Sequence, residues 1–200
     1  MRHDSGKLIV VSGPSGAGKS TVIAKAMKHR ADLHFSVSAT TRQARVGEVD
    51  GKDYYFLSHE QFETMIERGE FLVYAQYVGN FYGTPAAPVL EQLEGGNSII
   101  LDIEVQGAAS VRKAMPEAVT VFLTPPDFTA LEERLRKRGK DTEETIRDRL
   151  ARARVEFEEI PKYDYIVIND DVDDAAEELL AIILAEQCRT ADRLKLLSNH

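Results

Sequence analysis

Residues 13–20 read Gly-Pro-Ser-Gly-Ala-Gly-Lys-Ser, with the spacing G-x-x-x-x-G-K-S of a phosphate-binding loop. Glycines let the backbone wrap closely around a polyphosphate, so that several N–H groups and the positive end of a following helix point at it. Lys19 adds a positive charge near the outer phosphates, and the Ser20 hydroxyl suits Mg²⁺. The residues expected at the phosphates are Gly13, Pro14, Ser15, Gly16, Ala17, Gly18, Lys19, Ser20 and Thr21.

The context of this loop and a second segment support a nucleotide site. An apolar run, Leu8–Val11, precedes the loop, and a helical pattern follows it, which is the strand–loop–helix order that such a loop requires. The segment Ser98–Asp102 is an apolar strand that ends in a carboxylate, the usual partner of a phosphate loop near the metal. A strand-end Asp is often only a turn or cap residue, but the upstream loop favours Ser20 and Asp102 as holders of Mg²⁺, directly or through water.

Transfer of a phosphoryl group between two anionic substrates requires positioning and neutralisation of charge more than covalent chemistry. Arginine suits this task because it stays charged and binds phosphate bidentately. The candidates are Arg42, Arg45 and a basic segment over residues 134–154, although a single arginine is more often a solvated surface charge.

The elements that must position these groups alternate between strand and helix. Five mostly continuous apolar runs predict the strands of a parallel core sheet, covered on both faces. They are Leu8–Ser12, Phe35–Ser38, Ser98–Ile103, Ala118–Leu123 and Tyr163–Ile168. Helices are predicted over Gln61–Arg68, Pro88–Glu94, Phe128–Arg138, Glu143–Glu158 and Asp173–Arg189. The pattern predicts an α/β fold in which residues 37–87 form an inserted lobe with a small mixed sheet.

Composition narrows the class of protein. The chain has 200 residues, enough for one domain with inserted lobes, and its net charge of −8 argues against general affinity for nucleic acid or membranes. No apolar stretch is long enough to cross a bilayer, and the start leaves no room for a signal peptide, so we expect a cytoplasmic location. The single cysteine, Cys188, excludes an internal disulfide and a cysteine-based metal cage.

Several blocks, in order along nearly the whole chain, resemble the guanylate kinases, a family of P-loop nucleoside monophosphate kinases. They cover residues 12–20, 35–42, 47–54, 79–85, 101–107, 138–139 and 168–170. The resemblance implies the three-layer P-loop NTPase fold and Mg²⁺-dependent transfer from ATP to GMP or dGMP. It further implies one domain over residues 1–200. Its parts are a core (1–36, 88–126 and 158–200), a GMP-binding lobe (37–87) and a helical lid (127–157).

The resemblance also assigns roles to residues. Ser38, Arg42, Arg45, Tyr54 and Tyr82 would hold the GMP phosphate, a good dianion site of guanidinium and hydroxyl groups. Thr84 would reach the guanine, with Asp102 and Glu104 on the GMP side. Asn169 would lie near the adenine. Lys19, Arg42, Arg138 and Arg149 would be the catalytic groups, with Arg138 and Arg149 bridging the two sets of phosphates from the lid.

Two positions depart from the family pattern. Val73 stands where the family has a glutamate that reads guanine, and Glu104 stands where the family commonly has Asp. Val73 cannot accept hydrogen bonds, so Glu104 is a candidate for part of the guanine contact. Three alternatives follow: a related kinase acting on another nucleoside monophosphate or a sugar phosphate, a non-catalytic guanylate-kinase-like interaction module, and a hydrolase that shares the loop. Whether the chain is a monomer or a homodimer is open.

Overall fold

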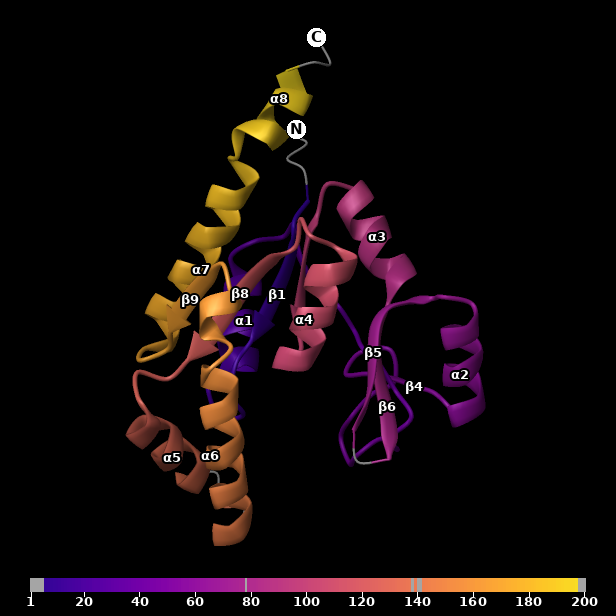
Figure 1. Cartoon of the computed structure of the whole chain (residues 1–200). Coiled ribbons are helices and arrows are strands. Elements are labelled where there is room, and N and C mark those ends of the chain that lie inside the picture. Colours follow the sequence, from indigo (N-terminus) through magenta and orange to yellow (C-terminus); the bar gives the residue numbers. More distant parts are fainter. Residues whose placement is uncertain (1–5, 78, 138, 140–141, 198–200) are drawn as a thin grey trace.

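The computed structural model describes residues 6–77, 79–137, 139 and 142–197. Five strands form a parallel sheet in the order β2-β7-β1-β8-β9 (Figure 1). Their bounds are β1 Leu8–Ser12, β2 Leu33–Phe35, β7 Ser98–Asp102, β8 Val119–Thr124 and β9 Tyr165–Ile168. The predicted α/β fold with a five-stranded parallel core is therefore confirmed. One predicted strand is displaced, because β2 ends at Phe35, where the pattern predicted the start of a strand.

Helices cover both faces of this sheet. Alternate residues of β1 point to opposite faces, as strand geometry requires. On one face Ile9 and Val11 belong to a core cluster with residues of α1 (Lys19–Lys28) and α7 (Val172–Gln187). On the other face Leu8 and Val10 belong to a second cluster with residues of α3 (Ala86–Glu94) and α4 (Val105–Ala114). The result is a three-layer core.

A second sheet lies within residues 39–85. It has four strands in the order β4-β3-β6-β5, one pair parallel and the others antiparallel. Helix α2 packs on it through Phe62, whose ring stacks on Phe71 and Phe81 with centroids 4.3 and 5.3 Å away. The bounds are β3 Ala39–Thr40, β4 Tyr55–Phe56, α2 His59–Glu67, β5 Phe71–Tyr77 and β6 Asn80–Pro85.

Helices α5 (Phe128–Lys137) and α6 (Glu143–Phe157) form a pair. Ile146 and Ala153 of α6 pack against Leu131 and Leu135 of α5. In Figure 1 this helical pair and the second sheet project from the same side of the core, away from the two chain termini. The core sheet therefore carries two separate projections beside one another.

The remaining elements lie at the carboxyl-terminal end. A short 3-10 helix, Ile160–Lys162, leads into β9, and α8 (Thr190–Leu197) follows α7. Within the described residues, no helix has the length and apolar character to cross a membrane.

Candidate active site

The loop between β1 and α1 has, at several points, a backbone conformation that residues other than glycine rarely adopt. Gly13 has a φ of 144°, and a Cβ placed there would lie 1.9 Å from the carbonyl oxygen of Leu123. Gly18 has a φ of 92° and is the N-cap of α1, with no side chain capping the helix. The first N–H groups of α1 therefore point into the loop, where they favour an anion.

Lys19 lies in the first turn of α1 and reaches back across the loop. Its Nζ donates to the carbonyl oxygen of Gly13 at 2.8 Å and lies 3.8 Å from Oδ1 of Asp102, at the end of β7. Burial raises the pKa of the Asp102 carboxyl above its ordinary value, and the positive charge of Lys19 opposes this shift. The structure thus places the strand-end carboxylate beside the lysine of the loop.

The groups near Lys19 fit Mg²⁺. Asp102 offers carboxylate oxygens, and the exposed Ser20 lies in the first turn of α1, so both potential ligands are hard oxygen donors. No group of three or more His, Cys, Asp or Glu side chains arranged to hold a metal occurs in the described part of the chain. Mg²⁺ that binds with nucleotide takes most of its ligands from phosphates and water, so a pair of oxygen donors suffices.

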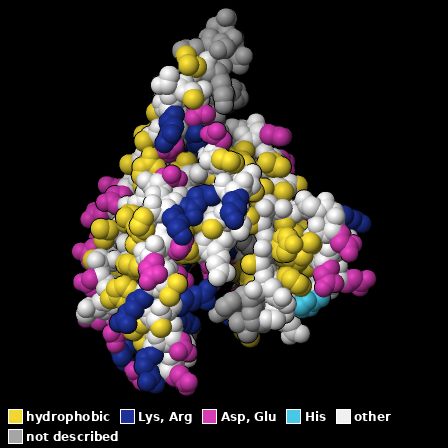
Figure 2. All heavy atoms as spheres, in the orientation of Figure 1, with side chains coloured by type: hydrophobic (Ala, Val, Ile, Leu, Met, Phe, Trp, Pro, Cys, Tyr) yellow, Lys and Arg dark blue, Asp and Glu magenta, His cyan; other side chains and the backbone are white. Residues whose placement is uncertain are grey.

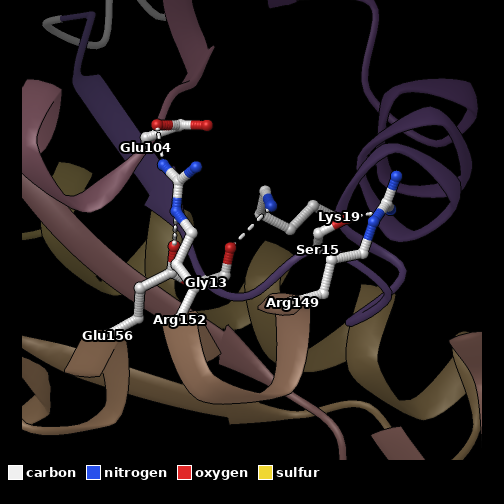
Figure 3. A pocket seen from close by; sticks show the side chains of 7 residues that line it. All are labelled: Gly13, Ser15, Lys19, Glu104, Arg149, Arg152 and Glu156. Atoms are coloured by element: carbon white, nitrogen blue, oxygen red, sulfur yellow. Dashed lines mark hydrogen bonds and ion pairs between the residues drawn. The ribbon is translucent and has the colours of Figure 1, made fainter. Parts of the chain in front are cut away.

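A cavity of about 320 Å³ lies over the loop, and we call it the loop cavity. Figure 3 shows the residues that line it, which come from the loop, from α6 and from the start of α4. The face in Figure 2 is hollowed between the helical pair and the second sheet, with Lys and Arg side chains on the side of the pair. The lining residues are Gly13, Ser15, Lys19, Glu104, Arg149, Arg152 and Glu156.

Helix α6 brings Arg149 to the loop. Its Nη1 donates to Oγ of Ser15 at 2.9 Å, across 134 residues of sequence (Figure 3). The structure thus brings five of the predicted site residues together at this cavity: Gly13, Ser15, Lys19, Glu104 and Arg149. Arg138, predicted to act beside Arg149, lies outside the described residues.

Two further residues of this cavity were not singled out from the sequence: Arg152, which was named only as part of the basic segment over residues 134–154, and Glu156. Nε of Arg152 donates to Oε1 of Glu156 at 3.1 Å, and Nη2 of Arg152 donates to Oε2 of Glu104. Burial raises the pKa of Glu156, and the charges of Arg152 and Lys19 oppose the shift. Positions 149, 152 and 156 share one helix face, so their spacing of three and four residues could have revealed them.

A second cluster forms around Arg42, on the second sheet. The Arg42 guanidinium donates to both carboxylate oxygens of Glu48, at 3.0 and 2.9 Å. It also lies over the rings of Tyr54 and Phe56, 5.4 and 5.8 Å from their centroids. Tyr82 of β6 meets Tyr54 edge to face, with centroids 6.3 Å apart. We call Arg42, Glu48, Tyr54 and Tyr82 the Arg42 cluster.

The cluster has a distinct electrostatic character. Hydrogen bonds to Glu48 raise the pKa of Arg42, so this guanidinium is charged throughout the working range of pH. Burial raises the pKa of Tyr54, with the charge of Arg42 opposing and the charge of Asp102 adding to the rise. The charge of Asp102 thus contributes to the electrostatic environment of Tyr54.

The other predicted residues of this region lie around the cluster. The carbonyl oxygen of Ser38 accepts from the backbone N–H of Tyr55 at 2.9 Å, which fixes the chain beside Tyr54. The backbone N–H of Arg45 donates to Glu48 at 2.7 Å, and the Arg45 side chain is exposed. Thr84 is buried in β6. The sequence pattern did not indicate Glu48, although this carboxylate orders the side chain of Arg42 and the backbone of Arg45.

Val73 of β5 is half-buried and packs toward the core. It pairs in register with Thr84 of β6, and its side chain packs against the core cluster that includes Leu101 and Ala108. Ile103, next to Glu104, also packs against this cluster. The position where a base-reading carboxylate was expected is therefore an apolar contact between the second sheet and the core.

Asn169, at the end of β9, lies behind the loop. Its side-chain Nδ2 donates to the carbonyl oxygen of Ala17 at 2.7 Å, and its backbone carbonyl oxygen accepts from Nη2 of Arg134 of α5 at 2.8 Å. Its buried Oδ1 has no hydrogen-bond partner among the residues that the structure describes. A buried acceptor without a donor suits a ligand N–H group.

Together these groups form two halves of a site for anionic ligands. One half is the loop cavity, with main-chain N–H groups, Lys19 and arginines from α6. The other is the Arg42 cluster, whose members do not line the loop cavity in the described part of the chain. Such an arrangement suits two phosphate-bearing ligands that must meet in line.

Comparisons with known proteins agree with this geometry. The family model described as guanylate kinase matches residues 5–186. A curated guanylate kinase from Halalkalibacterium halodurans is 51% identical over 189 residues, covering 94% of this chain and 93% of the relative. A guanylate kinase from Streptococcus thermophilus is 53% identical, covering 93% and 90%. The crystal structure of guanylate kinase from Anaplasma phagocytophilum is similar, with a TM-score of 0.77 and 35% identity over 94% of this chain and 90% of that one.

Proposed function

This chain belongs to the guanylate kinase family and is an ATP:GMP phosphotransferase, and we propose that it transfers the phosphoryl group between the loop cavity and the Arg42 cluster. The observation that carries this assignment of the site is the meeting of Lys19 and Arg149 at one cavity, from segments 130 residues apart in sequence. Cations from two separate elements over a phosphate loop suit charge that builds up on a phosphoryl group in transfer.

The donor half would be organised around the loop. The main-chain N–H groups of residues 13–21 and Lys19 would hold the phosphates of ATP. The buried Oδ1 of Asn169 would accept from the adenine amino group, which would give that oxygen the partner it lacks. Ser20 and Asp102 would hold Mg²⁺ with the phosphates, and the ion would neutralise charge on the donor.

The acceptor half would be organised around Arg42. The guanidinium groups of Arg42 and Arg45 and the hydroxyls of Ser38, Tyr54 and Tyr82 would bind the phosphate of GMP. Thr84 and Glu104 would contact the guanine, with Glu104 accepting from ring N–H groups. Glu48 would release part of its hold on Arg42 when the phosphate dianion arrives, because both anions need the same donors.

The transfer itself would be an in-line displacement. An oxygen of the GMP phosphate forms a bond to the terminal phosphorus of ATP, and the bond between that phosphorus and the bridging oxygen of ADP breaks. Arg149 would follow the charge from the donor to the acceptor, with Arg138 as a second predicted cation. Closure of the two halves would exclude water, which otherwise competes as the acceptor.

These roles divide the chain into parts. We propose that residues 1–36, 88–126 and 158–200 form the core, residues 37–87 the GMP-binding lobe, and residues 127–157 the lid. The cytoplasmic location, the absence of nucleic-acid and membrane partners and the choice between monomer and homodimer stay predictions.

The alternative function, transfer to another nucleoside monophosphate or to a sugar phosphate, is favoured by one observation. Val73 makes an apolar contact at the position where the base would be read. A screen of GMP, dGMP, IMP, AMP, UMP and ribose 1,5-bisphosphate with Mg²⁺ and ATP, followed by ADP release and product chromatography, decides between them. We expect GMP to give the highest kcat/KM. A higher value for another acceptor would replace GMP, and ATP hydrolysis without transfer to any acceptor would refute the proposed function.

The variant Val73→Glu, assayed with the same acceptors, tests whether position 73 limits the binding of GMP. We expect the KM for GMP to fall several-fold, because a new carboxylate can accept from guanine. An unchanged KM would count against the idea that a missing guanine contact at position 73 limits GMP binding.

A further inference from the structure

Arg152 lies between two carboxylates at the edge of the loop cavity (Figure 3). Its Nε donates to Glu156, one turn further along α6, and its Nη2 donates to Glu104 at the start of α4. The second contact spans 48 residues of sequence and joins the helical pair to the core. Neither contact was expected from the sequence.

The two carboxylates differ in how firmly they are held. The Glu156 side chain is 13% exposed, and it lies on the same helix as Arg152. The Glu104 side chain is 61% exposed. Arg152 therefore contacts a partly buried carboxylate through Nε and an exposed carboxylate through Nη2.

Glu104 has little else in its own element to orient it. It is the N-cap of α4 with an extended backbone, but its side chain makes no capping hydrogen bond. An exposed glutamate loses much rotamer freedom when a ligand fixes it, which weakens binding. A guanidinium that holds one carboxylate oxygen removes part of that cost before the ligand arrives.

We propose that Arg152 is a positioning residue for the acceptor, which holds the Glu104 carboxylate where it accepts from the N–H groups of the purine base. The inference rests on the proposed function, because it takes GMP as the acceptor and Glu104 as its partner. It extends that function by making a residue of the lid part of acceptor recognition. Arg152 is assigned to Glu104 and not to the phosphates, because it already faces two carboxylates.

Steady-state kinetics of Arg152→Gln test the proposal. We expect the KM for GMP to rise about three- to ten-fold, the loss that follows from freeing one side chain, while kcat and the KM for ATP stay within about two-fold. Arg152→Lys, which keeps the charge but not the fork of donors, should recover part of the loss. Arg147→Gln, an exposed arginine on the same helix, is the matched control and should behave as wild type.

A double-mutant cycle with Glu104→Ala makes the link specific. In that background Arg152→Gln should raise the KM for GMP no further, because the carboxylate it orients is gone. An unchanged or lower KM in Arg152→Gln, or equal effects in both backgrounds, would overturn the inference while leaving GMP phosphorylation intact. A fall in kcat and a rise in both KM values together with a lower melting temperature would show a merely structural role. A wild-type protein that phosphorylates no GMP would refute the proposed function itself.

Discussion

The loop cavity and the Arg42 cluster both gather positive groups for phosphate, but the fold builds them differently. The loop is shaped by distant parts of the core, since Gly13 packs under the Leu123 carbonyl and Gly18 against Asn169. The Arg42 cluster is ordered by near neighbours in sequence, since Glu48 holds Arg42 and the N–H of Arg45. The comparison indicates a donor half set rigidly by tertiary packing and an acceptor half set by local contacts that a ligand can exchange.

The largest effect is expected at Lys19, where the charge acts on the transferred group. Lys19→Met should lower kcat/KM by about a hundred- to a thousand-fold, comparable to the loss of one strong donor to the transition state. The free energy of unfolding should change little, because the side chain bonds only the loop carbonyl and Asp102 within the described structure. Lys28→Met, an exposed lysine on the same helix, is the control for kinetics and urea denaturation. A loss below ten-fold would separate the loop from catalysis.

Two glycines with the same φ angle test the rigidity of the two halves. Gly18 and Gly47 both have a φ of 92°, but a Cβ on Gly18 would lie 2.4 Å from Nδ2 of Asn169, whereas one on Gly47 would meet nothing within 4 Å. Urea denaturation should therefore show that Gly18→Ala lowers the free energy of unfolding by about 2–4 kcal/mol. For Gly47→Ala we expect about 1–2 kcal/mol, from the backbone alone. Equal values would contradict the proposed difference.

Substitution of Arg42 should weaken the binding of the acceptor GMP and not that of ATP. Arg42→Gln should raise the KM for GMP about ten- to a hundred-fold, the effect of losing a charged hydrogen-bond donor to a phosphate, and leave the KM for ATP nearly unchanged. Initial rates with each substrate varied in turn give both constants. Equal increases in the two would show that Arg42 does not distinguish acceptor from donor.

Asp102 lies at the end of β7 beside Lys19, and the effects expected from its substitution are smaller. Asp102→Asn should reduce activity about ten-fold and raise the Mg²⁺ concentration needed. Burial raises the pKa of Asp102. The folded state therefore gains stability by holding the proton on this carboxyl. That contribution is complete below the ordinary pKa of the unfolded chain, and it is lost as pH rises through the raised pKa of the folded state. The variant should thus be at least as stable as wild type at neutral pH, with the difference closing in acid. Thermal melts across pH that show the opposite order would contradict the buried position of this carboxylate.

The sequence predicted the donor half well because its chemistry is local. The order strand, loop and helix fixes where Lys19 lies, and a strand adjacent to β1 must bring Asp102 to the same edge. The sequence did not predict α4, because Gly107 lowers the helix propensity of this segment. The structure explains that glycine, since a Cβ there would press against Ile103 at 3.3 Å. Tertiary packing overrides propensity at this position.

The rest of the site depends on pairings that no local pattern specifies. Glu48 lies six residues from Arg42, and its role appears only when the intervening turn brings the two together. Arg152 and Glu104 meet only because α6 lies over the start of α4. Phe35 was expected to open a strand and instead closes one, because β2 pairs with β7 from Leu33 onward.

The central claim is that the two halves approach each other around bridging phosphates. The distance between spin labels at Val46, fully exposed beside Arg45, and Val155, exposed on α6, tests it in a chain in which Cys188 is replaced by serine. Adenosine and guanosine joined through five phosphates, added with Mg²⁺, should shorten and narrow the measured distance, while labelled protein keeps its activity. An unchanged distance distribution, with the compound shown to be bound by calorimetry, would contradict the account.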